Sequence, residues 1–376
     1  MIEAPILILG LVAALFLAFV LLARRSMPYV FCNATLSAWE ARFLPESKLA
    51  ELAGAPSAEA VLSALEESEY REQIAELRRS APVDPLEFER ALRENANARY
   101  RELLGMLPKG RRATVARILS RIDVWNLKAI ISMIHSGVTP GDRARELMPS
   151  PTMSRERLEM LASARTLEEL LEYLRGSEYH HVISGAMEAY RREGLRALLL
   201  ALDRHYWSSL WSDVLGRRDQ RKVMREMIGY ELDSLNARLI LRLKQERAPP
   251  EEISACIVRP SHELNEEMLR AMVMAEDLAS AINMIHITTV GRVLSEVSGE
   301  IGEKGATAAE AALERGRIRL FRWLAMTRFF TVAPAISYIA QKEHELKKLR
   351  TIYRLKFDGA EPGAVRRTLE GMMVGA

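Results

Sequence analysis

The sequence lacks most features that mark an enzyme or a secreted protein. Only two of its 376 residues are cysteine, Cys32 and Cys256, which excludes a disulfide framework. No alternation of polar and apolar residues is long enough to predict a strand. The glycine-rich stretch 299–305 lacks phosphate-loop spacing, and the seven histidines lack metal-ligand spacing. We therefore expect no catalytic residue, no cofactor and no metal.

The sequence also has little excess charge. A net charge of +3 gives little support to nucleic acid as a partner, so none is expected. The hydrophobic fraction of 49% and the charged fraction of 27% are ordinary for a folded protein. Leu, Ala, Glu and Arg dominate, whereas Val and Thr are sparse, which predicts an all-α fold. The length predicts two or three domains.

One stretch recurs three times, at residues 122–131, 232–241 and 344–353. Each copy has an acid, Asn or Lys three residues later, and a base two residues further on. The acids and their partners are Asp123 with Asn126, Asp233 with Asn236, and Glu345 with Lys348. Residues i and i+3 share a helix face, so we interpret these pairs as groups that bond to loop backbone and join modules. A catalytic role is the less favoured alternative.

A second repeat supports the same division. Residues 49–74 and 158–183 share eleven identical positions, including a Ser-Glu-Tyr triplet that ends at Tyr70 and Tyr179. A degenerate third copy covers 268–288. Each copy precedes a long amphipathic helix, and the three helices are predicted at 86–106, 186–211 and 308–330. We predict an N-terminal segment, 1–28, followed by three similar helical modules, 29–150, 151–258 and 259–376.

The N-terminal segment contains an uncharged run from Ile6 to Ala23. As a helix it would be roughly 27 Å long, which is enough to cross a hydrocarbon core. A cleaved signal peptide is the alternative, but the basic residues Arg24 and Arg25 follow the run rather than precede it. We expect a single-pass anchor in the cell membrane, a connector at 26–28, and the main body on the cytoplasmic face.

Basic clusters are candidate partner interfaces, for acidic proteins or lipid headgroups. Solvated helix faces are an equally open interpretation. The candidate interface residues are Arg217, Arg218, Arg221, Lys222, Lys347, Lys348, Arg350 and Arg354.

The C-terminal run 334–352 reads P-x-I-x-Y-I-x-x-K-E-x-E-x-x-x-L-R-x-I. Together with Asp123-x-x-Asn126-Leu127-Lys128, the run 202–206 and the Ser-Glu-Tyr triplets, it resembles the family of C subunits in archaeal A-type and bacterial V/A-type ATP synthases. The d subunits of eukaryotic vacuolar ATPases are relatives of that family. The resemblance covers about residues 29–370.

The resemblance implies an all-helical funnel of three similar domains with pseudo-threefold symmetry. It implies a non-catalytic central-stalk component of the rotor, which couples the central shaft to the membrane proteolipid ring during proton or sodium transport and ATP synthesis. The expected partners are the central-shaft subunits, the proteolipid ring subunits and the lipid bilayer. The apolar segment 6–23 departs from typical members, and our hypothesis is that it enters the centre of the ring. A membrane-anchored helical scaffold unrelated to the rotary ATPase is the alternative.

Overall fold

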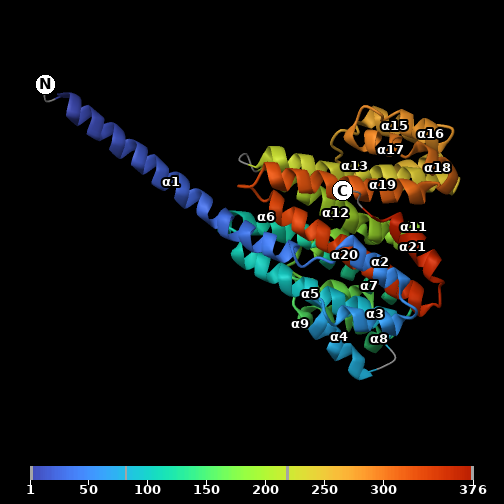
Figure 1. Cartoon of the computed structure of the whole chain (residues 1–376). Coiled ribbons are helices and arrows are strands. Elements are labelled where there is room, and N and C mark those ends of the chain that lie inside the picture. The colour runs from blue at the N-terminus through green and yellow to red at the C-terminus, as the bar shows by residue number, and fades with distance from the viewer. Residues whose placement is uncertain (1–2, 81–82, 217–219, 374–376) are drawn as a thin grey trace.

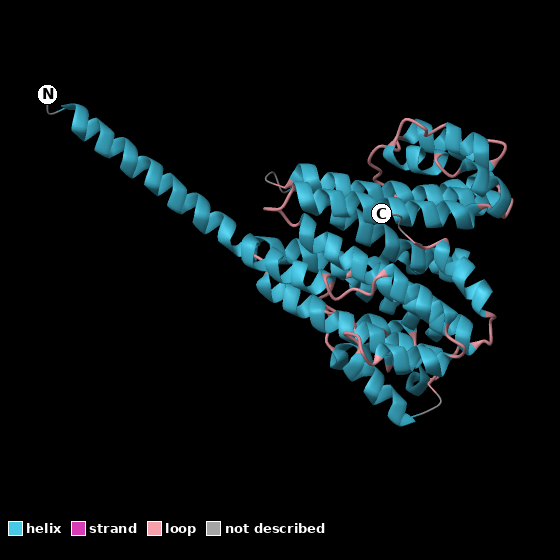
Figure 2. Ribbon diagram, viewed as in Figure 1, coloured by secondary structure: helices cyan, strands magenta, loops and turns pink. Residues whose placement is uncertain are grey.

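The computed structural model describes residues 3–80, 83–216 and 220–373, without the side chains of residues 3–9, 22, 25, 28 and 80. Within these ranges every regular element is a helix, and no strand is present (Figure 1, Figure 2). The prediction of an all-α fold is therefore confirmed.

The chain folds into long helices joined by groups of short ones. The first are α1 (Glu3–Glu40), α2 (Glu46–Gly54), α3 (Ala58–Leu65), α4 (Arg71–Leu77), the 3-10 turn η1 (Arg78–Ser80), α5 (Pro85–Met106), α6 (Lys109–Leu119), α7 (Arg121–His135) and α8 (Pro140–Glu146). Next come α9 (Arg155–Ala162), α10 (Leu167–Tyr173), α11 (Glu178–Glu193), α12 (Leu195–Gly216), α13 (Arg221–Gln245) and α14 (Pro250–Cys256). The last are α15 (Glu266–Met274), α16 (Leu278–Asn283), α17 (Thr289–Ser295), α18 (Ser298–Lys304), α19 (Ala306–Thr327), α20 (Ala333–Phe357) and α21 (Pro362–Glu370).

Helix α1 projects from the body at its N-terminal end and packs on the body at its C-terminal end (Figure 1). The packed face carries buried residues at helical spacing, and it contacts α20 and α5. These buried residues are Tyr29, Cys32, Leu36 and Trp39. The helix is continuous through residues 26–28, where the sequence predicted a connector. Residue 28 is a proline, which lacks a backbone N–H and so removes one hydrogen bond from the helix. The packing of α1 from Tyr29 onward stabilises the helix beyond this residue.

The structure does not support the expected membrane anchor at residues 6–23. In the described part of the chain, no helix combines the length and the hydropathy that a bilayer span requires. The side chains of residues 6–9 and 22 belong to the expected span and lie outside the described residues.

The apolar core has two parts. The larger cluster includes residues from α1 to the first half of α13 and from α20 and α21, so the two ends of the body share one core. The smaller cluster lies between the second half of α13 and helices α14 to α19. Figure 1 shows α15 to α18 gathered at one end of the long pair α13 and α19. The expected module boundaries at 150 and 258 fall in the loops after α8 and α14, and the threefold arrangement stays a prediction.

The three recurring motif stretches lie on α7, α13 and α20, which we call the motif helices. Helix α7 contacts α8 and α9, and α13 contacts α14 to α17. Helix α20 contacts α2 and α3, near the start of the chain. Each of the first two motif helices therefore packs on the short helices that follow it, and the last motif helix packs on the first short helices.

Candidate functional site

A cavity of about 350 Å³ lies where three pairs of long helices meet. The pairs are α5 with α7, α12 with α13, and α19 with α20, so each third of the chain supplies one motif helix and one long neighbour. The described charged residues of its wall are Glu89, Arg93, Arg121, Glu231, Arg238, Glu314, Arg317, Glu343, Lys347 and Arg350. We call this space the central cavity.

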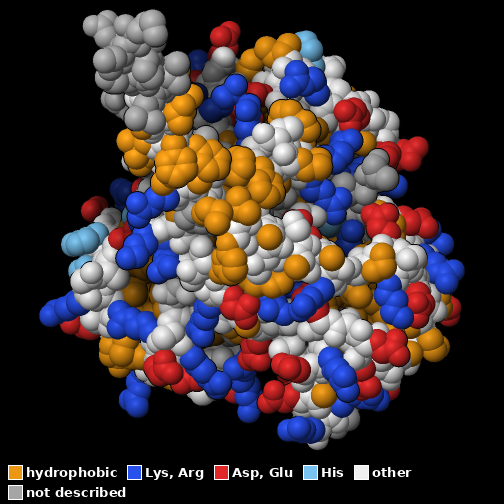
Figure 3. All heavy atoms as spheres, turned by 60° about the vertical axis from the view of Figure 1, so that its left-hand side comes forward, with side chains coloured by type: hydrophobic (Ala, Val, Ile, Leu, Met, Phe, Trp, Pro, Cys, Tyr) orange, Lys and Arg blue, Asp and Glu red, His pale blue; other side chains and the backbone are white. Residues whose placement is uncertain are grey.

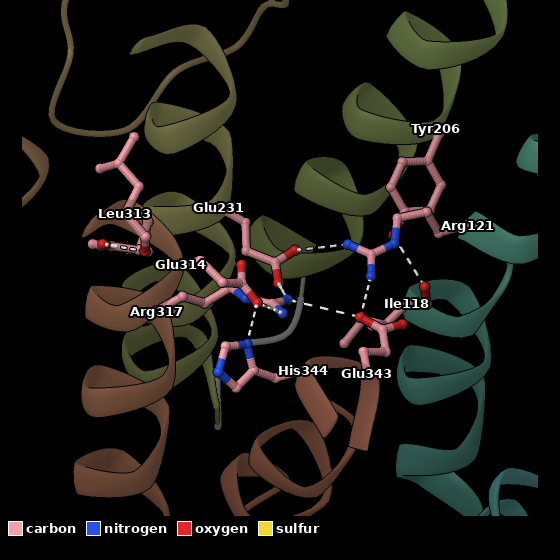
Figure 4. A network of polar contacts seen from close by, with 10 residues as sticks. Ile118, Arg121, Tyr206, Glu231, Leu313, Glu314, Arg317, Glu343 and His344 are labelled. Carbon is pink, nitrogen blue, oxygen red and sulfur yellow. Dashed lines mark hydrogen bonds and ion pairs between the residues drawn. The ribbon is translucent and has the colours of Figure 1, made fainter. Parts of the chain in front are cut away.

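The three motif helices bring charged side chains together in the wall of the central cavity (Figure 4). Arg121, Glu231 and Glu343 each stand two residues before the motif acid of their own helix. The Arg121 guanidinium forms an ion pair with Glu343, and its Nη1 lies 3.8 Å from Oε2 of Glu231. The same repeat position on α7, α13 and α20 therefore links all three helices directly.

Arg317 of α19 completes this network (Figure 4). Its Nη1 donates to Oε1 of Glu231 at 3.0 Å, and its Nη2 donates to Oε1 of Glu314 at 2.8 Å. Its Nη1 also lies 3.8 Å from Oε2 of Glu343. The side chains of Arg317 and Glu231 are only 12% and 11% exposed, so these pairs are shielded from solvent far better than surface pairs. Four helices are thus held by one connected set of ion pairs.

The network favours the charged forms of Glu343, Glu314 and Arg121. Burial by itself would raise the pKa of Glu343 and Glu314, but neighbouring Arg121 and Arg317 outweigh it, and both pKa values fall below the ordinary range. The field of Glu343 raises the pKa of Arg121 well above its usual value. Burial lowers the pKa of His344, which favours the neutral form of its imidazole. The described residues of the network thus join helices through charge.

The motif residues of α7 bond to the loop that follows α8. Asn126 is fully buried; its Nδ2 donates to the Met148 carbonyl and its Oδ1 accepts from the Met148 N–H, both at 2.8 Å. The Asp123 carboxylate accepts hydrogen bonds from the hydroxyls of Ser150 and Thr152. One face of α7 thus satisfies both backbone groups of Met148 and also binds the side chains of Ser150 and Thr152 in the same loop.

The motif residues of α13 repeat this arrangement. Asn236 is buried and makes the same pair of bonds, at 2.9 Å each, with the N–H and carbonyl of Val258. The Asp233 carboxylate accepts from the backbone N–H groups of His262 and Glu263, at 2.9 and 2.7 Å. Burial, which is the largest effect, raises the pKa of both motif aspartates despite these bonds.

The third motif copy makes different contacts, with the start of the chain. Glu345 accepts from the Leu44 N–H at 2.7 Å and from the Tyr70 hydroxyl at 2.5 Å. Lys348 is buried, and burial lowers its pKa. Tyr179, at the repeat position of Tyr70, is buried and its ring packs edge-on against His205. Its pKa is raised by burial and by the charge of Asp123, the motif acid that corresponds to Glu345.

The basic clusters do not form a single described surface. Arg217 and Arg218 lie outside the described residues, while Arg221 is half-buried and Lys222 is exposed. In the second cluster Lys347 and Arg350 line the central cavity, and Lys348 is buried. Arg354 is exposed and pairs with Asp358 one turn further along α20. Basic residues that are close in sequence point their side chains in several directions, because a helix turns about 100° per residue.

Sequence reasoning missed the ion-pair network. A signal was present, because the residue two positions before each motif acid is charged in all three copies: Arg121, Glu231 and Glu343. No comparable signal pointed to Arg317, which lies outside the repeated stretches.

The fold and the site place this chain in the class of all-helical proteins, in which long helices are joined by ion pairs around a central cavity. A family model described as "ATP synthase (C/AC39) subunit" matches residues 32–367. The chain belongs to this family, and the resemblance read from its sequence is confirmed.

Similar proteins are C subunits of A-type ATP synthases. The C subunit of the A-type ATP synthase from Thermococcus onnurineus is 30% identical over 347 residues, which cover 90% of this chain and 89% of the relative. Its counterpart from Methanocaldococcus jannaschii is 26% identical over 344 residues, which cover 91% and 86%. The counterpart from Pyrococcus abyssi is 27% identical over 340 residues, which cover 90% and 89%.

Proposed function

We propose that this chain is a non-catalytic central-stalk component of an A/V-type ATP synthase. In this role it couples the central shaft to the proteolipid ring, on the cytoplasmic side of the membrane, during proton or sodium transport and ATP synthesis. Family membership supports the assembly. The single observation that carries the mechanical role is the central cavity, whose walls come from three helix pairs braced by shared ion pairs.

The central cavity suits a socket for the foot of the shaft. Torque passes through a socket only when its walls do not yield. The Arg121–Glu343 and Arg317–Glu231 pairs tie together helices that are far apart in sequence. They are partly shielded from water, which strengthens them relative to exposed pairs. A cavity braced in this way transmits rotation as one body.

An apolar surface beside α1 suits contact with the ring. Met27 and Phe31 on α1 are 65% and 64% exposed, and Phe330, just after α19, is 56% exposed. The two segments are adjacent because Asn33 of α1 donates a hydrogen bond to the Phe329 carbonyl. Figure 3 shows apolar side chains gathered below the grey N-terminal segment. A contiguous exposed apolar patch marks an interaction site, and proteolipid subunits are apolar partners.

The test is a pull-down of the tagged full-length chain in mild detergent, with mass spectrometry of the copurifying proteins. Both shaft and proteolipid subunits should be recovered. Phe330→Asp should reduce proteolipid recovery severalfold and leave shaft recovery intact. Met284→Asp is the matched control, since Met284 is 49% exposed and lies after α16, away from α1. A folded chain that recovers neither kind of partner would contradict the proposal and favour an unrelated helical scaffold.

A further inference from the structure

One basic position recurs in all three motif helices, five residues after the motif acid. It is occupied by Lys128 on α7, Arg238 on α13 and Arg350 on α20. The Lys128 Nζ pairs with Oδ2 of Asp203 at 2.6 Å, and Nη1 of Arg350 pairs with Oε1 of Glu89 at 2.8 Å. Two of the three equivalent cations are therefore neutralised by acids on neighbouring long helices.

Arg238 has no such partner. Its Nε donates to the backbone carbonyl of Ser234 at 3.2 Å, and no described carboxylate lies within 4.0 Å of its guanidinium. The side chain is half-buried and lines the central cavity. Burial lowers the pKa of Arg238, and the field of Glu314 only partly offsets that effect. A partly desolvated cation that lacks an ion-pair partner is less favourable in the free chain than a paired one.

The surrounding cavity shares this imbalance. Among its described lining residues six side chains are basic and four are acidic, so the wall has an excess of two positive charges. Lys347 on α20 is a second cation without an ion-pair partner in the described chain, and it is exposed to the cavity. The two unpaired cations, Arg238 and Lys347, therefore lie on α13 and α20. Arg350 of α20 is not counted, because it is paired with Glu89.

We propose that Arg238 is the docking point for a carboxylate of the central shaft, with Lys347 adding to the attraction. This inference rests on the proposed function, because it assigns a chemistry to the occupant of the socket. Complementary charge at a binding surface favours one partner and fixes its register. Since Lys128 and Arg350 are satisfied internally, only one of the three equivalent positions is open. Docking at this position on the α13 wall favours one orientation of the shaft foot.

The experiment measures the dissociation constant of the purified full-length chain with the central-shaft subunits of the same complex. Arg238→Glu should weaken binding at least about tenfold, and Arg238→Gln by a smaller factor. Arg270→Glu, an equal charge change on the exposed surface of α15, should leave binding within about twofold. Thermal unfolding of each free variant accompanies the binding data. Arg238→Gln should unfold at the same temperature as the wild type or a higher one, since an uncompensated cation has been removed.

The outcomes separate the two proposals. Wild-type binding that Arg238→Glu and Arg238→Gln leave unchanged would overturn this inference while the proposed function stands. A wild-type chain that does not bind the shaft would overturn both. Lower affinity in Arg238→Gln without loss of thermal stability supports docking, because a purely structural role would lower both. A Glu→Lys or Asp→Lys change at the shaft's end that restores binding to Arg238→Glu would identify the partner carboxylate.

Discussion

At the scale of single residues, the two motif asparagines show why the sequence repeats them. A side-chain amide offers a donor and an acceptor in the same plane, and so it matches the N–H and carbonyl of one loop residue. Asn126 and Asn236 use this match on Met148 and Val258 with bond lengths that agree within 0.1 Å. Each loop begins the passage to the next group of short helices, so a single side chain sets the position of a whole segment.

Replacing this amide tests its contribution to stability. Asn126→Ala should lower the free energy of unfolding by about 2–4 kcal/mol, because the buried N–H and carbonyl of Met148 both lose their partner. Urea denaturation followed by circular dichroism provides the measurement. Asn283→Ala is the control, since Asn283 is exposed at the end of α16, and its effect should stay within about 0.5 kcal/mol. Equal effects of the two substitutions on the free energy of unfolding would contradict a stabilising role for the hydrogen bonds of Asn126.

At the scale of elements, helix α17 depends on a glycine. A Cβ at Gly291 would lie 1.8 Å from the carbonyl oxygen of Ile285, a backbone atom that cannot move aside. The turn before α17 therefore packs against the helix more closely than any side chain allows. Gly302, in α18, has open space where a Cβ would stand, and no contact requires its glycine.

These two glycines predict substitutions of opposite sign. Gly291→Ala should destabilise the protein by at least about 2 kcal/mol, because a backbone segment has to shift. Gly302→Ala should stabilise it by about 0.5–1 kcal/mol through the higher helix propensity of alanine. Thermal unfolding of the two variants side by side is the measurement. A neutral Gly291→Ala would mean that the turn at Ile285 adjusts freely.

Periodicity in the sequence predicted most of the long helices. The prediction was wrong where a local residue ends a helix although the apolar periodicity continues. The helix predicted at 186–211 is divided into α11 and α12 at Gly194, whose φ of 81° is incompatible with a continuing helix. The apolar spacing continues across this break because both helices bury their faces in the same core. The loops after α7 and α13 contain the short helices α8 and α14. Seven residues are too few for periodicity to reveal a helix.

At the scale of the whole molecule, the motif pattern located the helices that form the central cavity but not the charged contacts within it. Helical spacing shows which residues share a face of one helix, whereas the network depends on how four helices are placed around the cavity. The recurrence of charge at Arg121, Glu231 and Glu343 could have indicated the site. Arg317 could not be found, because only packing of α19 brings it to that centre.

The whole body is also closed by a buried charge cluster between its two ends. Lys342 of α20 is fully buried; its Nζ lies 2.6 Å from Oε1 of Glu69 and 2.7 Å from the Tyr70 hydroxyl. Glu345, on the same helix, accepts from that hydroxyl. The cluster holds the turn between α3 and α4 against α20, and this turn belongs to the first repeat.

Removing the cation tests this closure. Lys342→Met should destabilise the protein by about 3–5 kcal/mol, because Glu69 and Glu345 would remain buried without a counter-charge. Guanidinium denaturation gives the magnitude, and limited proteolysis should cut first within residues 41–80. Lys304→Met should have little effect, because Lys304 is exposed and its Nζ lies as far as 3.9 Å from Oε2 of Glu300. A Lys342→Met protein as stable as the wild type would contradict the role assigned to the cluster.

The closure has a consequence for synthesis of the chain. Tyr70 and its partner Glu345 are 275 residues apart in sequence. At ribosomal rates of about 5–20 residues per second, the first repeat leaves the ribosome roughly 15–55 s before the helix that covers it exists. During that interval it lacks the native contacts that α20 supplies and keeps only those with helices made earlier, such as α5. The two ends of the body therefore join only after α20 has been made, and until then the apolar residues of the first repeat that α20 covers stay exposed.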